Sequence, residues 1–252
     1  MPPARMWCTW GGLPATLGLS ACAGSQSMLD PAGPSAQAIA LVWWWMLGVA
    51  VLVVLGVVVA WWLAMRRGRH TEEGATDEAA AAHGLRWMVG GGIVLPSVAI
   101  VTLLLFGSSA GFHQLPLPLS WTGAAGPGGA PLRVHVLARQ WAWDLRYPES
   151  GVQLHNELRL PVGQPVDIHV SSEDVIHSFW VPRLGGKIDA IPGRTNVVRL
   201  QADQAGTFRG QCAEFCGLHH AHMVMTVIAM PADAFDAWLA AQPVVASSGG
   251  EP

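Results

Sequence analysis

The chain has 252 residues, of which 51% are hydrophobic and 12% charged, and its formal net charge is −3 at pH 7. Soluble domains carry about a quarter charged residues, so this composition indicates a membrane part joined to a water-soluble part. The 14 basic residues are outnumbered by 17 acidic ones. We therefore expect no nucleic-acid partner, since such proteins usually present a strongly basic surface.

Residues 1–21 resemble an export signal that ends in the tetrapeptide Leu-Ser-Ala-Cys22. This tetrapeptide is similar to the lipobox of bacterial lipoproteins, in which the cysteine is lipidated and becomes the new N-terminus. The alternative is an ordinary signal peptide cleaved nearby, after Ala21 or Ala23. In both cases the mature N-terminus is exported.

Two long apolar stretches follow a Pro-, Gly- and Ser-rich periplasmic tether at residues 22–37. Residues 38–65 contain no charge and exceed the roughly 20 residues that span a bilayer. A second uncharged stretch covers residues 87–112. We predict two transmembrane helices, because a soluble helical hairpin would have a polar face and each of these segments is apolar all round.

The loop between the two stretches, residues 66–86, contains Arg66, Arg67, Arg69 and Arg86. By the positive-inside rule this loop is cytoplasmic, so the N-terminus and everything after the second helix face outward.

A Pro- and Gly-rich linker over residues 113–131 leads into a segment of short β-like runs at residues 132–242. Gly and Pro turns separate the runs, which indicates an antiparallel sandwich or barrel. A final helix is expected at residues 234–241 and a disordered tail at 243–252. The expected strands cover residues 132–143, 157–160, 165–170, 195–201, 206–211 and 223–230.

Potential metal ligands crowd into residues 212–223, which hold Cys212, Cys216, three histidines and Met223. Copper binds thiolate, imidazole and a weak axial sulfur together. A single blue-copper site needs one cysteine, so two cysteines favour a dinuclear centre.

Two other interpretations of this motif remain open. An oxidising compartment would allow a disulfide between Cys212 and Cys216, but this leaves the histidines unexplained. A tetrahedral zinc site could use both cysteines, His220 and one more histidine, but zinc has little use for the Met223 thioether. The spacing alone favours copper over both.

A metal site folded from one loop usually needs an upstream ligand on a neighbouring strand, and His177 is the best candidate. It stands between apolar residues, where a histidine is more often a satisfied core group than a ligand. Its aromatic neighbours would provide a dry shell around a metal.

Three segments resemble subunit II of the haem-copper cytochrome c oxidases. They read Asp-Val-Ile-His-Ser-Phe-Trp-Val-Pro (174–182), Lys-Ile-Asp-Ala-Ile-Pro-Gly-Arg-Thr-Asn (187–196) and Cys-x-Glu-x-Cys-x-x-x-His-x-x-Met (212–223). They stand in that family's order, and the resemblance covers roughly residues 26–242. It points to bacterial members that contain the dinuclear copper centre CuA and have no fused cytochrome c domain. It implies a two-helix transmembrane hairpin followed by a cupredoxin-like β-sandwich at residues 132–242.

Carried over position by position, the resemblance implies a ligand set for two copper ions. Cys212 and Cys216 would be bridging thiolates. His177 and His220 would each bind one copper, and Met223 would be a weak ligand to one of them.

The resemblance also assigns roles to two residues beside this set. The backbone carbonyl of Glu214 would be a weak ligand to the other copper, and its side chain would reach a Mg²⁺ or Mn²⁺ ion shared with subunit I. Trp141 would accept electrons beneath a docked cytochrome, whereas Trp143 fits a core position at least as well. His219 and His222 match no ligand position.

The implied function is electron transfer in the bacterial inner (cell) membrane. Electrons would pass from cytochrome c to the copper centre and then to haem in subunit I, where O₂ is reduced to water, with subunit III as a further partner. The copper ligands favour cytochrome c over quinol as the donor. The alternatives are a membrane-anchored copper-delivery or storage protein and a structural domain with a Cys212–Cys216 disulfide. Nitrous oxide reductase carries a similar motif, but on a soluble protein.

Overall fold

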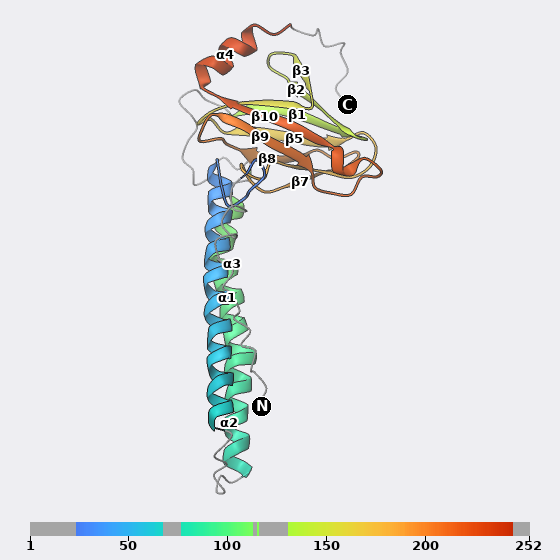
Figure 1. Ribbon diagram of the computed structural model, residues 1–252. Coiled ribbons are helices and arrows are strands. Elements are labelled where there is room, and N and C mark those ends of the chain that lie inside the picture. Colours follow the sequence, from blue (N-terminus) through green and yellow to red (C-terminus); the bar gives the residue numbers. More distant parts are fainter. Residues whose placement is uncertain (1–23, 68–76, 113–114, 116–130, 244–252) are drawn as a thin grey trace, which may run out of the picture.

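A computed structural model describes residues 24–67, 77–112, 115 and 131–243, and it places a long helical hairpin beneath a β-sandwich (Figure 1). The expected signal segment, Cys22, most of the expected linker and the expected tail from residue 244 lie outside the described residues.

The hairpin consists of α1 (Pro34–Arg67) and a second arm made of α2 (Asp77–Val89), a π-helical turn η2 (Gly90–Val94) and α3 (Leu95–Phe112). The mean hydropathy reaches 2.6 in Pro34–Arg66 and 2.3 in Ala81–Ser108, and the most apolar 18-residue window of each stretch is not buried inside the protein. Ser35, Ala36 and Ala40, at the start of α1, are buried. Both helices are long and apolar enough to cross a bilayer. The second arm is already helical from Asp77, within the segment expected as a loop, because hydropathy marks where apolar residues begin and not where a helix begins.

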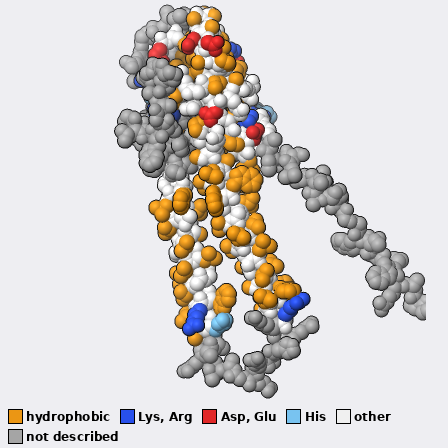
Figure 2. All heavy atoms as spheres, turned by 90° about the vertical axis from the view of Figure 1, so that its left-hand side faces the viewer, with side chains coloured by type: hydrophobic (Ala, Val, Ile, Leu, Met, Phe, Trp, Pro, Cys, Tyr) orange, Lys and Arg blue, Asp and Glu red, His pale blue; other side chains and the backbone are white. Residues whose placement is uncertain are grey.

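Apolar side chains cover the length of the hairpin, and basic side chains gather at the end away from the sandwich (Figure 2). Arg66 and Arg86 belong to that end, and the guanidinium of Arg66 lies 3.8 Å from the ring centre of Trp62. The positive-inside rule places such an end in the cytoplasm, which puts the sandwich on the outer side.

The sandwich is built from two five-stranded sheets. The first has the order β3-β2-β1-β5-β8, and the second has the order β4-β10-β9-β6-β7. The first sheet comprises β1 (Leu132–Arg139), β2 (Ala142–Tyr147), β3 (Val152–His155), β5 (Val166–Ser172) and β8 (Asn196–Leu200). The second comprises β4 (Glu157–Pro161), β6 (His177–Trp180), β7 (Ile188–Ala190), β9 (Gly206–Cys212) and β10 (Val224–Met230). A short helix η3 (His220–His222) precedes β10, and α4 (Ala232–Ala240) follows it.

In most of the longer strands alternate residues point between the sheets, as the two-residue period of a strand requires. In β1, for example, Val134, Val136 and Ala138 are buried while their neighbours are exposed. Trp143, Tyr147 and Phe179 are the largest fully buried side chains. Trp143 lies beside His177 and Phe179 in the part of the core near the potential metal ligands, whereas Tyr147 packs against Phe235 and Trp238 of α4.

The structure differs from the expected strands in three respects. The run over residues 132–143 is a hairpin, because Arg139 pairs with Ala142 and the chain turns at Gln140–Trp141. Neither residue is a usual turn former, so alternation alone could not show the break. Strands β3, β6 and β7 were not expected. Each sheet also contains one parallel pair, β1 with β5 and β10 with β4, and is therefore mixed and not wholly antiparallel.

Candidate metal centre

The potential ligands come from two neighbouring strands of the second sheet. β6 begins with His177 and β9 ends with Cys212, and the two strands pair through Phe179 and Cys212. After Cys212 the chain forms a loop that returns through η3 to β10. The amide of Cys212 donates to the carbonyl of Met223 at 2.9 Å and closes the base of this loop. The loop thus brings residues 212–223 beside His177.

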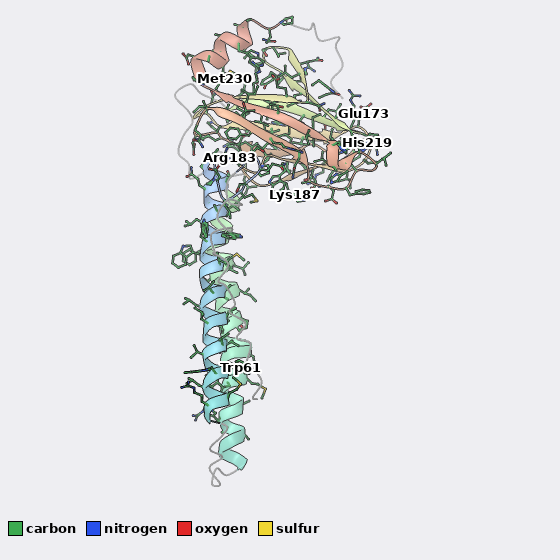
Figure 3. The ribbon with its side chains drawn as sticks, in the orientation of Figure 1. Trp61, Glu173, Arg183, Lys187, His219 and Met230 are labelled. Atoms are coloured by element: carbon green, nitrogen blue, oxygen red, sulfur yellow. The ribbon has the colours of Figure 1, made fainter. Side chains whose placement is uncertain are left out.

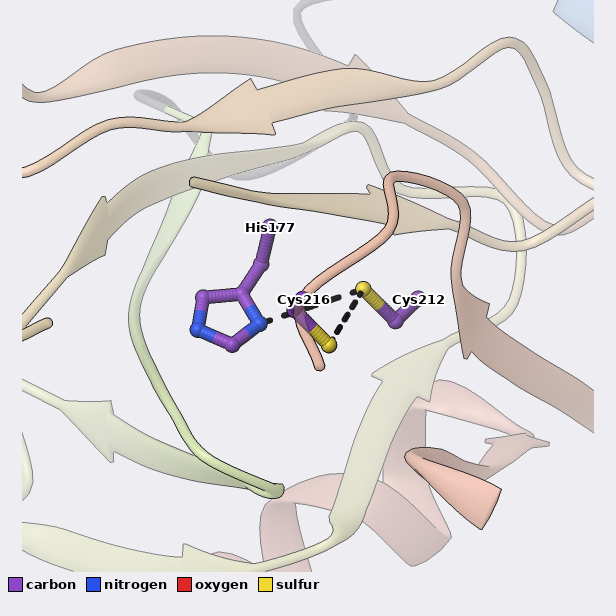
Figure 4. A group of neighbouring side chains, drawn as sticks. All are labelled: His177, Cys212 and Cys216. Atoms are coloured by element: carbon purple, nitrogen blue, oxygen red, sulfur yellow. Dashed lines mark hydrogen bonds between the residues drawn. The ribbon is translucent and has the colours of Figure 1, made fainter. Parts of the chain in front are cut away.

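Three of the expected ligands converge closely. Nδ1 or Nε2 of His177, Sγ of Cys212 and Sγ of Cys216 all lie within 4.8 Å of one another, and all three residues are buried (Figure 4). Sγ of Cys212 lies 3.8 Å from Sγ of Cys216 and 3.9 Å from Nδ1 of His177. Both cysteines are free thiols, since a disulfide would require about 2.05 Å between the sulfurs.

The remaining expected ligands surround the same two sulfurs. Nδ1 of His220 lies 3.6 Å from Sγ of Cys216, and Sδ of Met223 lies 3.8 Å from it. The carbonyl oxygen of Glu214 lies 3.1 Å from Sγ of Cys212. The structure therefore brings together all six residues that the sequence predicts at a metal site.

The thiols lie in a dry environment. Cys216 is 3% and Met223 1% exposed, and His177 is fully buried. Burial and the neighbouring Cys212 raise the pKa of Cys216 to about 12. The Cys216 thiol is therefore protonated at neutral pH unless a bound cation replaces its proton. Two soft sulfurs, two imidazoles and a thioether in such a pocket fit a copper site.

Glu214 and the two other histidines occupy the rim of the site. The Glu214 carboxylate is exposed and lies 4.0 Å from Nζ of Lys187. His219 and His222 are exposed, and the His219 ring stands edge-on to Trp141 with 4.6 Å between ring centres. In Figure 3 His219 and Glu173 mark this end of the sandwich, while Lys187 lies on its lower side.

Trp141 lies in the β1–β2 turn, next to the metal loop. Its Nε1–H donates to the carbonyl of Cys216 at 3.3 Å, and Nε2 of Gln140 donates to the same oxygen at 2.8 Å. Trp143 points into the core, with 6.3 Å between its ring centre and that of His177. Trp141 thus contacts the loop that carries Cys216, whereas Trp143 lies beside the buried His177.

Sequence reasoning assigned no role to three residues that shape the site. Asp174 contacts His177, Gln140 contacts Cys216, and Gly217 adopts φ 115°. A side chain at Gly217 would start 3.1 Å from Nε2 of Gln140. Only Asp174 carried a signal, its position three residues before His177, because a metal-binding histidine usually has a carboxylate or carbonyl partner.

Comparison of this chain with known proteins identifies its family. The family described as "Cytochrome C oxidase subunit II, periplasmic domain" matches residues 150–230, a range that contains all six potential ligands. This chain belongs to the cytochrome c oxidase subunit II family. The membership confirms the resemblance found in the sequence and the β-sandwich that it implied.

Each of the individual relatives described next matches less than half of this chain. Cytochrome c oxidase subunit 2 of Alkalihalophilus pseudofirmus is 43% identical over 112 residues, which cover 44% of this chain and 33% of the relative. Ubiquinol oxidase subunit 2 of Acetobacter aceti is 37% identical over 109 residues, 43% of this chain and 36% of the relative. The periplasmic domain of subunit II of cytochrome oxidase (CoxB) of Bradyrhizobium japonicum is 34% identical, covers 44% of this chain and 92% of that domain, and gives a TM-score of 0.43. The chain spans about a third of the length of the two curated subunit II relatives.

Proposed function

We propose that this protein is subunit II of a respiratory cytochrome c oxidase. It accepts electrons from cytochrome c at a dinuclear copper centre and passes them to haem in subunit I, where O₂ is reduced to water. The observation that carries the proposal is the pair of buried free thiols, 3.8 Å apart, with one imidazole beside each. The protein is an oxidoreductase only within that complex.

The ligand set is part of the proposal. Cys212 and Cys216 would hold two copper ions together through their thiolates, and His177 and His220 would each supply an imidazole ligand to one of them. Met223 lies on the Cys216 side of the pair and the carbonyl of Glu214 on the Cys212 side. A thiolate-bridged copper pair supplies a one-electron redox couple in which each metal–ligand bond changes little on reduction.

The spread of the donors supports two metal ions over one zinc. Four donors on one tetrahedral ion, with bonds of about 2.0–2.3 Å, lie within about 4 Å of one another. Here His177, Cys212 and Cys216 form a group within 4.8 Å, and His220 stands outside it although its Nδ1 is 3.6 Å from Sγ of Cys216. Each imidazole therefore lies beside a different sulfur, His177 beside Cys212 and His220 beside Cys216.

Trp141 is the residue that we propose receives the electron. Its ring is only partly buried, and its Nε1–H reaches the carbonyl of Cys216. One hydrogen bond thus connects a solvent-accessible indole to the backbone of a bridging cysteine. The exposed side chains of Phe215 and Leu218, at 77% and 84% exposure, give the same rim an apolar surface on which a protein donor can dock.

The partners and the compartment follow from the same proposal. One matching relative is a ubiquinol oxidase subunit, so the choice of cytochrome c over quinol depends on the copper ligands and not on overall similarity. Subunits I and III surround the hairpin in the bacterial inner membrane, with the sandwich in the periplasm. The exposed Glu214 carboxylate binds Mg²⁺ or Mn²⁺ at the boundary with subunit I.

The test is copper reconstitution of the full chain, followed by visible absorption, EPR and a copper-to-protein ratio. We expect a purple protein with two coppers per chain and hyperfine splitting from two equivalent nuclei. Cys216→Ser removes this signal, and Cys22→Ala, outside the site, leaves it unchanged. One copper with single-nucleus splitting would point to a copper-delivery or storage protein, and a Cys216→Ser protein with the normal dinuclear spectrum would refute the ligand assignment.

A further inference from the structure

The segment that precedes the first membrane helix is fixed between the ends of both sheets. The amide of Ala32 donates to the carbonyl of Arg183 at 2.8 Å, and the carbonyl of Ala32 accepts from the amide of Asp203 at 2.8 Å. Arg183 follows β6 of the second sheet, and Asp203 follows β8 of the first. Ala32 is 1% exposed. One residue of the expected tether therefore connects the two sheets.

Side chains on either side of Ala32 strengthen this connection. Nε of Arg183 donates to the carbonyl of Asp30 at 2.7 Å, and its Nη2 lies 2.9 Å from Oδ2 of the same residue. Nε2 of Gln37, in the first turn of α1, donates to Oδ2 of Asp203 at 3.0 Å. We call residues 30–37, with Arg183 and Asp203, the clasp.

Gly33 is the position at which the clasp approaches the sandwich most closely. A Cβ atom at Gly33 would lie 2.1 Å from the carbonyl oxygen of Gln201 and 3.3 Å from that of Leu184. Both obstacles are backbone atoms, so neither can rotate away as a side chain could. Only glycine fits there, and α1 begins at the next residue, Pro34.

The clasp is connected to the metal site through one short strand. β6 begins with His177 and ends at Trp180, three residues before Arg183. In Figure 3 Arg183 lies where the sandwich meets the hairpin, and His219 lies at the far end of the sandwich. A small rotation of the sandwich about the clasp therefore moves the metal site by a larger displacement.

We propose that Asp30, Gly33 and Arg183 are positioning residues for electron transfer. They fix the sandwich to the outer end of α1 and so hold the copper ligands at a set place relative to the acceptor in the membrane. The inference rests on the proposed function, since it assumes that the acceptor is a membrane-embedded partner. It assigns to the segment before the first membrane helix a role in onward electron transfer and none in copper binding.

The first test compares Gly33→Ala with Gly48→Ala in the assembled oxidase. Gly48 also lies in α1, but a Cβ there meets nothing within 4 Å. For Gly33→Ala we expect an unchanged copper spectrum, unchanged reduction of the copper centre by cytochrome c, and onward transfer to haem slowed roughly 10–100-fold, because small misplacements are costly. Gly48→Ala should match the wild type in its copper spectrum, in its reduction by cytochrome c and in onward transfer to haem.

A second test keeps the proposal falsifiable if Gly33→Ala does not accumulate. Arg183→Asp should slow onward transfer, and the double variant Asp30→Arg with Arg183→Asp should restore it by reversing the ion pair. The inference is overturned if Gly33→Ala or Arg183→Asp transfers electrons from the copper centre to haem at the wild-type rate. Loss of the copper spectrum in these variants also overturns it, because the clasp would then serve folding. A wild-type protein without a dinuclear copper spectrum refutes the proposed function instead.

Discussion

Asp174 holds the ring of His177 in the orientation that a metal ligand requires. Nε2 of His177 lies 2.8 Å from Oδ1 of Asp174, and the amides of Gln140 and Val175 donate to the same carboxylate. Burial acts to raise the pKa of Asp174, but these hydrogen bonds outweigh it and lower the pKa to about 2. The carboxylate is therefore ionised at neutral pH and accepts the Nε2 proton, which leaves the lone pair of Nδ1 facing Cys212.

Replacing Asp174 by Asn should weaken copper binding without unfolding the sandwich. The amide lacks the negative charge that fixes the tautomer of His177, and loss of such a partner typically lowers metal affinity about 10–100-fold. Copper titration of the full chain measures this change. Asp236→Asn, on the exposed face of α4, is the control and should leave the affinity unchanged. Equal affinities in the two variants would contradict the role given to Asp174.

Gly217→Ala should distort the metal loop. Its φ of 115° strains any other residue, and the added Cβ would lie 3.1 Å from Nε2 of Gln140. Gly163→Ala is a matched control, because Gly163 has φ 78° but a Cβ there meets nothing within 4 Å. Backbone strain of this kind costs about 1–3 kcal/mol, so both variants should unfold at lower urea concentration. Only Gly217→Ala should alter the EPR spectrum of the copper-loaded protein.

The cluster of side chains at the candidate site could be predicted from the sequence because most of its members occupy one short segment. Cys212, Cys216, His220 and Met223 lie within twelve residues, and His177 stands in a recognisable motif. The partners of these ligands could not be predicted in the same way. Gln140 reaches Cys216 across a sequence separation of 76 residues, through a turn that alternation did not reveal. The clasp was missed because its contacts run through the backbone of Ala32 and Gly33, which have no side-chain pattern.

The fold was predictable to a similar extent. The membrane helices were evident because hydropathy is a local property. The short strands β6 and β7 were not, since β6 has three consecutive buried residues and β7 has only three residues, so neither shows an alternating pattern. The parallel pairing of β1 with β5 depends on how the chain crosses between the sheets, which no local pattern encodes.

Tyr147→Phe should destabilise the sandwich and leave the metal site intact. The buried Tyr147 hydroxyl donates to the carbonyl of Arg159 at 2.7 Å and accepts from its amide at 2.9 Å, which connects β2 to β4 across the two sheets. Phenylalanine leaves both backbone groups without this partner, at a cost of about 1–3 kcal/mol. Urea unfolding measures the loss, and the copper EPR spectrum should not change. A change in that spectrum would mean that the conformation of the metal loop depends on the packing at the far end of the core.

The sandwich should lose stability as the pH falls below neutral, in part through His135 and His169. Their rings stack on β1 and β5 with 5.1 Å between centres. His135 lies on the exposed face of β1, but partial desolvation of its ring, followed by Arg133 and Arg146, lowers its pKa. Partial desolvation and the neighbouring His135 lower the pKa of His169. A folded-state pKa below the unfolded value of 6.5 means that the unfolded chain binds protons more readily. The stability that this pair contributes is thus present above pH 6.5 and decreases as the pH falls through that value.

Urea unfolding of the metal-free chain between pH 7.5 and 5, two values chosen to bracket the unfolded histidine pKa of about 6.5, measures this dependence. The double variant His135→Gln with His169→Gln should show a shallower loss of stability with falling pH than the wild type. His83→Gln, in the hairpin outside the sandwich, is the control and should follow the wild type. If the double variant keeps the full wild-type slope, the acid sensitivity originates in other groups, because removing both rings removes their entire proton linkage.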